Sequence, residues 1–249
     1  MRLDLPSNFK FYKQKSFESE KLKVLNISEI YEAQTKKSTR SLVTALQKLT
    51  KFPLADMLVE DFHWYIRQLA ITGYSKQTRT FEWTSKYGNT LLSEIDITSF
   101  VVHELRDDFE LPAGYRLPTM KDFYEIEELD SIAKTWLYTQ AQYIDAPTWE
   151  QRIAKLDNDK LEFIKQLQSI KFGVEEYAIV YDYEFNINSW LEKCKKSKML
   201  LQDEKEFNKE YLALKEEIEY WESVKESGSP VEVEPERIHF PISASLLLP

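Results

Sequence analysis

The sequence changes its hydrophobic periodicity within one stretch, VEDFHWYIRQLAITGYSKQTRTFEWTSKYGNTLLSEIDI at residues 59–97. Residues 59–72 repeat apolar side chains at helical spacing, and Gly73 follows as a typical C-terminal cap. In residues 79–97, aromatic and β-branched side chains surround Gly88-Asn89, a pair that tolerates the positive φ of a turn. The stretch therefore predicts a helix followed by a β-hairpin, as in an α+β fold.

Most of the remaining chain is predicted to be helical, because glycine is scarce and several residues match helix starts. Residues before Ser38 read as irregular, and residues 98–104 as a third strand after the hairpin. The expected helices are 39–50 after Ser38, 119–144 opened by Thr119 with Asp122, and 148–156 opened by Thr148 with Gln151. A break at Asp157-Asn158 is expected next, followed by a helix that runs to Lys171 and is capped by Gly173.

The C-terminal region has a different pattern. Residues 177–187 and 231–240 read as strands of one small sheet, and the strongly charged residues 190–226 between them have a helical period. We therefore expect two domains, a helical one at 1–157 that carries the hairpin and a second at 158–249. The expected class is a mostly helical α+β fold with small antiparallel sheets and a charged C-terminal helical segment.

Two apolar features in this region are the candidates for partner contact. The first is a heptad-like seam in the charged segment, which predicts an antiparallel helix pair or a short partner-binding coiled coil. An amphipathic helix packed on its own domain explains the seam more simply than a partner surface does. The second is the apolar tail, which must pack on the fold or on another protein. The candidate residues are Phe207, Tyr211, Leu214, Ile218 and Trp221 in the seam, and Ile242, Leu246, Leu247 and Leu248 in the tail.

Charge and composition disfavour two classes of partner. The 249 residues include 33 Lys and Arg against 42 Asp and Glu, a formal charge of −9. This balance disfavours nucleic acid and anionic membranes, which require clustered cations. Neither a signal peptide nor an apolar run of transmembrane length is apparent, and the single cysteine fits a reducing compartment, so we expect a cytoplasmic location.

Catalytic and metal-binding patterns are weak. His63, His103 and His239 are far apart in the sequence, and Cys194 has no associated base, so we expect no metal, no cofactor and no enzymatic activity. The acidic clusters 107–110 and 125–128 could hold a divalent metal in a hydrolase, but a solvated acidic face explains them more simply.

The order of several motifs resembles the baseplate hub assembly chaperones of T-even-type tailed phages. The motifs are LPSNFKFY from Leu5, DFHWYIRQLAITGYSKQTRTFEWTSKYGN from Asp61, LPTMKDFYEIEEL from Leu117, WLYTQAQYID from Trp136, and the tail that runs from an aromatic residue to proline. The resemblance covers most of residues 1–187. The chain departs from the family pattern in two ways. Some relatives carry paired cysteines in the hairpin and again near the C-terminal strand, whereas this chain has Ser85 and Tyr87 in the hairpin and no cysteine pair near the C-terminal strand. The 190–226 segment is also longer here.

The resemblance implies a non-enzymatic tail morphogenesis factor that acts in the cytoplasm of the infected bacterium. Its partners would be other phage tail or baseplate hub proteins, and a homo-oligomer is compatible with it. Such a factor would cover apolar surface on an incompletely assembled hub subunit. A structural baseplate component retained in the virion, and a metal-dependent hydrolase, stay open as alternatives.

Overall fold

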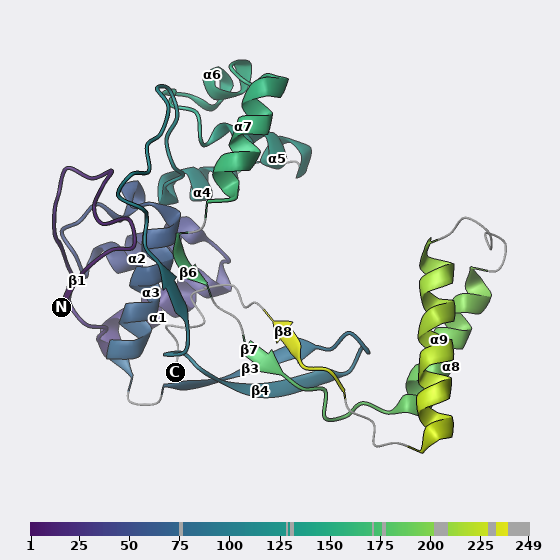
Figure 1. Ribbon diagram of the computed structural model, residues 1–249. Coiled ribbons are helices and arrows are strands. Elements are labelled where there is room, and N and C mark those ends of the chain that lie inside the picture. The colour runs from purple at the N-terminus through teal and green to yellow at the C-terminus, as the bar shows by residue number, and fades with distance from the viewer. Residues whose placement is uncertain are drawn as a thin grey trace. The chain divides into compact units, whose positions relative to one another are not determined.

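The computed structural model describes residues 1–74, 77–127, 129, 132–170, 172–175, 178–201, 209–228 and 233–238. Helix predominates over strand in these residues, and the strands pair into small two-stranded antiparallel sheets (Figure 1). The predicted α+β class is therefore confirmed. Within the described ranges, no helix is both long enough and apolar enough to cross a bilayer.

Two compact units divide the chain, and each is built from separate stretches of sequence. The first holds the described residues within Met1–Arg79 and Asp96–Glu176, and the second holds those within Thr80–Ile95 and Tyr177–His239. The hairpin therefore groups with the C-terminal region. These bounds differ from the expected division after residue 157, which assumed that each domain is one continuous stretch.

Three helices and a small sheet form the N-terminal part of the first unit. The elements are β1 (Arg2–Leu3), β2 (Phe17–Glu18), α1 (Val24–Thr35), α2 (Thr39–Gln47), a 3-10 turn (Leu54–Asp56) and α3 (Val59–Gly73). Ser38 caps α2 as predicted, because its side chain accepts a hydrogen bond from the Ser41 amide. Helix α1 was not predicted. Among its described residues only the apolar side chains of Ile30 and Ala33 are buried, so its sequence has no long apolar stripe that would indicate a helix.

The core of this part lies where α2 and α3 meet the N-terminal segment. The predicted stripes of both helices are buried, and aromatic rings fill the space between them: Phe17 contacts Phe52 and Tyr65 edge to face, at centroid distances of 5.3 and 4.9 Å. Fully buried side chains in this cluster include Phe17, Ile30, Leu46, Leu54, Met57, Phe62, Tyr65, Ile66 and Leu69. Burial of a side chain of this size typically contributes about 2 kcal/mol.

The second half of the first unit contains four short helices and a two-stranded sheet. The elements are β5 (Val101–His103), α4 (Met120–Glu127), α5 (Ile132–Ala141), α6 (Trp149–Ala154), α7 (Asn158–Gln168) and β6 (Gly173–Glu175). Thr148 caps α6 as predicted, and Asp157, expected only as part of a break in the chain, caps α7. Ile164 and Leu167 of α7 are buried with Leu58, Leu117, Tyr143 and Ile144 in a second apolar cluster.

The second unit combines the hairpin with a helix pair. Its elements are β3 (Thr78–Thr84), β4 (Thr90–Asp96), β7 (Ala178–Val180), α8 (Ile187–Leu200), α9 (Lys209–Ser227) and β8 (Glu236–Ile238). Trp83, Leu91 and Val180 form one buried cluster of this unit. The hairpin turn matches the prediction, since Gly88 has a φ of +86°. The predicted pairing of the two C-terminal strand regions is also confirmed, with Ile179 opposite Arg237 in an antiparallel register.

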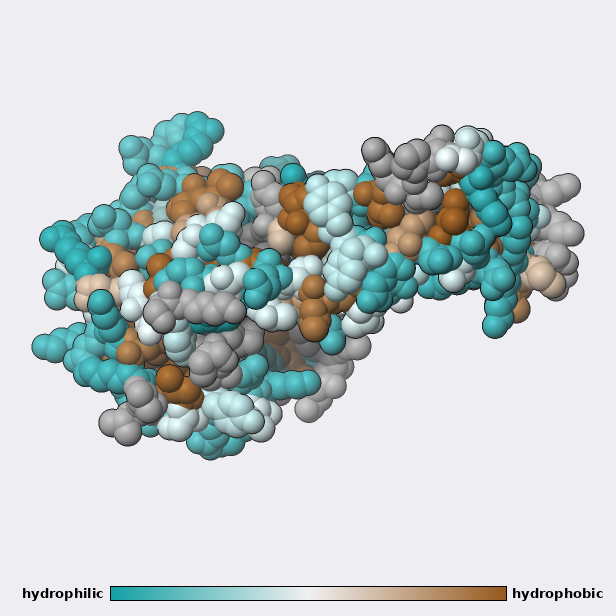
Figure 2. Space-filling view, turned by 90° about the horizontal axis from the view of Figure 1, so that it is seen from below, coloured by the Kyte–Doolittle hydropathy of each residue, from teal (hydrophilic) through white to brown (hydrophobic). Residues whose placement is uncertain are grey.

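Helices α8 and α9 lie side by side and run in opposite directions (Figure 1). Near their connection, Lys198 of α8 lies over the ring of Tyr211, and at the other end Trp190 and Trp221 both contact Tyr87. The pair presents a mostly hydrophilic surface, visible at the right of Figure 2. The predicted antiparallel helix pair is therefore present within the chain itself.

Several predicted boundaries were wrong. The helix expected at 119–144 is two helices, because α4 ends at Glu127 and α5 begins at Ile132. Asp130-Ser131, residue types that favour helix starts, interrupt the apolar stripe there. Among the described residues, the strand expected at 177–187 covers Ala178–Val180, and the one expected at 231–240 covers Glu236–Ile238. The third strand exists as β5, but it pairs with β6 and not with the hairpin.

The two predicted glycine caps have other roles. Gly73 is the last residue of α3, and the extended residue Tyr74 follows it. Gly173 has a φ of +99°, but it begins β6 and does not cap α7. A Cβ atom on Gly173 would lie 2.7 Å from Cβ of Glu60, so this glycine permits close packing of β6 on α3.

Candidate binding pocket

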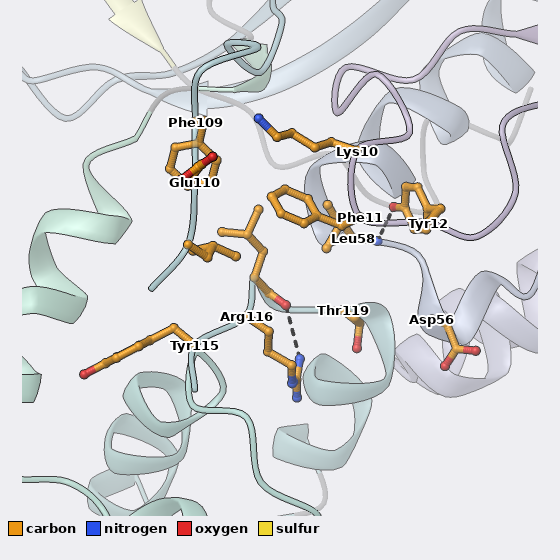
Figure 3. A pocket seen from close by; sticks show the side chains of 12 residues that line it. Lys10, Phe11, Tyr12, Asp56, Leu58, Phe109, Glu110, Tyr115, Arg116 and Thr119 are labelled. Carbon is orange, nitrogen blue, oxygen red and sulfur yellow. Dashed lines mark hydrogen bonds between the residues drawn. The ribbon is translucent and has the colours of Figure 1, made fainter. Parts of the chain in front are cut away.

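The first unit contains a cavity of about 540 Å³ that three separate segments line (Figure 3). The segments are residues 10–12, the turn before α3 at residues 56–58, and the loop between β5 and α4 at residues 109–119. The lining residues are Lys10, Phe11, Tyr12, Asp56, Leu58, Phe109, Glu110, Leu111, Tyr115, Arg116, Leu117 and Thr119.

A buried carboxylate fixes the first of these segments. Asp61, near the start of α3, accepts hydrogen bonds from the Ser7 amide at 3.0 Å, the Ser7 hydroxyl at 2.5 Å and the Tyr12 hydroxyl at 2.7 Å. The Tyr12 oxygen also accepts a hydrogen bond from the Leu58 amide at 2.7 Å, drawn in Figure 3. Because Asp61 and Ser7 are completely buried, these bonds determine where residues 7–12 lie.

Burial changes the titration of both groups in this contact. Desolvation raises the pKa of Asp61, although the three donors partly oppose the change. Burial, followed by the negative charge of Asp61, raises the pKa of Tyr12, which therefore stays protonated and can donate to the carboxylate. The contact is a structural attachment of the N-terminal segment to α3.

A second buried carboxylate fixes the loop before α4. Both terminal nitrogens of Arg116 bond to Asp122, at 2.5 and 2.6 Å, and Arg152 of α6 adds a third contact at 2.8 Å. The Thr119 amide donates to the same carboxylate at 2.8 Å, as the predicted capping spacing requires. Burial alone would raise the pKa of Asp122, but Arg116 and Thr119 lower it below the usual range.

Backbone pairing joins the turn before α3 to the start of α4. The Val59 amide donates to the Pro118 carbonyl at 3.2 Å, and the Met120 amide donates to the Met57 carbonyl at 2.9 Å. Together with the two buried carboxylates, these bonds hold the pocket walls in fixed positions. The pocket is therefore preorganised, which reduces the entropic cost of binding.

The interior of the pocket is apolar and aromatic. Phe11, whose side chain is 38% exposed, contacts Phe109 edge to face at 6.2 Å between ring centroids. Tyr115 packs on Phe163 of α7 at 4.9 Å. Figure 3 shows Phe11 and Leu58 near the middle of the pocket, with Asp56 on one side and Glu110 on the other. Such a lining can bind an apolar side chain or a short peptide segment.

Those residues predicted for partner contact that the structure describes do not line this pocket. In α9, Ile218 and Trp221 are buried against α8 and Tyr87, and Leu214 is half-buried in the same cluster. Tyr211 is half-buried under Lys198. Phe207 and the tail residues Ile242, Leu246, Leu247 and Leu248 lie outside the described residues. The described part of the seam thus packs within its own unit.

Most residues considered for chemistry have structural contacts. Nε2 of His103 lies 2.9 Å from Oε2 of Glu175, across the β5–β6 pair. His63 lies near Glu60, and burial lowers its pKa to about 4. Cys194 is buried between α8 and α9, and burial raises its thiol pKa. His239 lies outside the described residues.

One carboxylate of the first acidic cluster and two of the second are engaged in the same way. Asp108 pairs with Arg106, Glu125 accepts a hydrogen bond from Trp149, and Glu127 accepts one from the Thr39 amide. In the part of the chain that the structure describes, no three His, Cys, Asp or Glu side chains are grouped closely enough to hold a metal ion.

Comparison with known proteins gives no relative: no family model, no curated protein and no solved structure matches the chain.

Sequence reasoning missed the pocket because its residues have no shared periodicity. Phe11, Phe109 and Leu111 lie in loops, where an apolar side chain has no spacing pattern that indicates its neighbours. The stretch 5–12 has no pattern besides the resemblance, and the stretch 117–129 adds only the helix start at Thr119 with Asp122. Their apolar content inside loop segments was the signal that could have indicated a surface cavity.

Proposed function

We propose that this chain is a non-enzymatic assembly factor for the central hub of a tailed-phage baseplate, and that it binds a hub or tail protein through the pocket of the first unit. The observation that supports this proposal is the convergence of the resembling motifs. Phe11 and Tyr12 of the first motif meet Leu117 and Thr119 of the third at the pocket, and Asp61 of the second anchors Tyr12.

The hairpin turn of the second unit is one of the two places where the chain departs from the resembling family. Ser85 lies in the hairpin turn, the region where some relatives carry paired cysteines, and its hydroxyl donates to Asp182 at 2.5 Å. Asn89 donates to the same carboxylate at 2.9 Å, and the Lys86 amide donates to Glu236 of β8 at 3.0 Å. Hydrogen bonds to carboxylates thus join the turn to Asp182, which follows β7, and to Glu236 of β8.

The geometry of the pocket suits a binding role. An assembly factor must recognise a partner that is not yet in its final complex and later release it, which favours a modest interface with a few aromatic anchors. The fixed walls and the partly exposed ring of Phe11 fit that requirement. The proposed place of action is the cytoplasm of the infected bacterium.

Affinity purification from infected cells tests the proposal. A tagged copy of the chain should co-purify during assembly with an identified phage hub or tail protein, and mass spectrometry of finished particles should find the chain absent or far below one copy per baseplate. Incorporation at a fixed copy number would instead favour a structural baseplate component. Recovery of no phage tail protein during infection would contradict the proposal.

A further inference from the structure

The charged residues of the pocket differ in whether they already have partners. Nζ of Lys10 donates to the carbonyl oxygen of Asp107 at 2.5 Å, and Arg116 is held by Asp122. By contrast, Asp56 and Glu110 are exposed, and neither carboxylate accepts a hydrogen bond from any residue that the structure describes. The pocket therefore presents two unused carboxylate acceptors, while Asp122 neutralises Arg116 and a backbone carbonyl holds the Lys10 ammonium group.

The apolar lining separates these two acceptors. In Figure 3, Phe11 and Leu58 lie between Asp56 and the side of the pocket that holds Phe109 and Glu110. The cavity of about 540 Å³ falls in the range of protein ligand sites, roughly 300–1,000 Å³. It has room for one or two large apolar side chains, with a negative charge available on either side of them.

We propose that the pocket binds an extended peptide segment of a partner protein that has an aliphatic or aromatic centre flanked on both sides by Lys or Arg. The apolar centre would displace water from Phe11, Leu58 and Leu111, and the flanking cations would donate to Asp56 and Glu110. This inference rests on the proposed function for the identity of the partner, which would be a hub or tail protein carrying such a segment. The charges expected on the peptide are inferred from the pocket residues alone.

Charge complementarity excludes the simplest alternative peptides. An acidic segment would place like charges beside Asp56 and Glu110, and a polar segment would leave the aromatic lining unfilled. Exposed ion pairs contribute modestly, so each flanking cation is expected to improve affinity about threefold, or about tenfold for the two together. The preference should weaken as salt concentration rises.

Fluorescence anisotropy with labelled hexapeptides tests this inference on the full chain. The probes share a central Leu-Phe pair flanked by lysines, by glutamates or by serines, and a fourth has lysines around a Ser-Ser centre. We expect the lysine-flanked Leu-Phe peptide to bind about tenfold more tightly than the serine-flanked one, and the glutamate-flanked peptide to bind more weakly than both. The lysine-flanked Ser-Ser peptide should bind weakly, because the apolar contact is missing.

Charge-matched variants identify the residues responsible. Asp56→Asn combined with Glu110→Gln should reduce the preference for lysine to about twofold or less. Asp4→Asn combined with Glu18→Gln removes the same charge from exposed positions outside the pocket and should keep the preference. Equal binding of the lysine and glutamate peptides, a preference that survives in the pocket variant, or no peptide binding at all would overturn the inference. If the wild-type chain still captures a hub protein from infected cells, the proposed function survives that result.

Discussion

The Tyr12 hydroxyl oxygen lies 2.7 Å from Oδ2 of Asp61, and this hydrogen bond joins the N-terminal segment to α3. The same oxygen accepts the Leu58 amide, so one side chain satisfies a buried carboxylate and a buried backbone donor. The wall of the pocket therefore depends on a contact between residues that are 49 positions apart in the chain.

Tyr12→Phe tests this contact. The substitution keeps the ring but leaves the Leu58 amide unpaired and removes one donor from Asp61, which should destabilise the first unit by about 2 kcal/mol. Chemical unfolding followed by tryptophan fluorescence measures the loss. Tyr31→Phe is the matched control. Tyr31 is 63% exposed, so loss of its hydroxyl group should change the stability little. Equal stability of the two variants would contradict the role given to Tyr12.

The pH dependence of stability should differ in sign between Glu60 and Asp122. Burial raises the pKa of Glu60 to about 7, so ionisation disfavours the folded state increasingly between the unfolded value of 4.5 and pH 7. Glu60→Gln should therefore become more stable than the wild type as the pH rises through this range. Because the Glu60 side chain is 40% exposed, solvent screening limits the gain to about 1 kcal/mol.

Asp122 has the opposite behaviour. Its lowered folded-state pKa contributes stability above the unfolded value of 3.8, and that contribution is lost as the pH falls through the folded-state value. Asp122→Asn should thus destabilise the protein by about 2 kcal/mol at neutral pH, with the difference shrinking in acid. Thermal midpoints measured from pH 3 to pH 8 distinguish the two patterns. A constant difference for both variants would show that neither carboxylate is perturbed.

The local signals in the sequence predicted the helix starts and the hairpin, because their causes lie within a few residues. Ser38, Thr148 and Asp157 bond amides three residues away, and Gly88 supplies its own positive φ. The pairing of β5 with β6 depends on partners about 70 residues apart, and no local pattern identifies them. The pocket also depends on distant partners. Asp61 of α3 accepts hydrogen bonds from Ser7 and Tyr12, and no pattern within α3 identifies those two residues.

Gly173→Ala should be markedly more destabilising than a glycine substitution in open space. The new Cβ would lie 2.6 Å from Oε2 and 2.7 Å from Cβ of Glu60, and the φ of +99° disfavours any L residue. We expect a loss of about 3 kcal/mol, of which about 1 kcal/mol is backbone strain. Gly114→Ala is the control, because its φ is +86° and no atom lies within 4 Å of the added carbon. Similar losses in thermal unfolding would show that the approach to Glu60 is unimportant.

Ile218→Glu distinguishes a core role for the α9 seam from a partner surface. Ile218 is 6% exposed between α8 and α9, so an unpaired carboxylate there should cost about 3 kcal/mol and reduce the helical signal in circular dichroism. Tyr220→Glu on the same helix is the control, since Tyr220 is 58% exposed and should tolerate the charge. An unchanged thermal midpoint for Ile218→Glu would favour the partner-surface interpretation of the seam.

The most direct test of the account is capture of hub proteins by the wild-type chain and by Phe11→Ser. Each tagged protein is expressed in cells infected with phage that lacks the untagged chain, and the co-purified tail proteins are quantified by mass spectrometry. Phe11 is partly exposed in the pocket, so its replacement should leave the circular dichroism spectrum and thermal midpoint unchanged. Tyr31→Ser makes the same truncation at an exposed position of α1 and controls for nonspecific loss of aromatic surface. The account predicts that Phe11→Ser loses at least about nine-tenths of the captured hub protein while Tyr31→Ser retains it. Equal capture by a folded Phe11→Ser variant would contradict it.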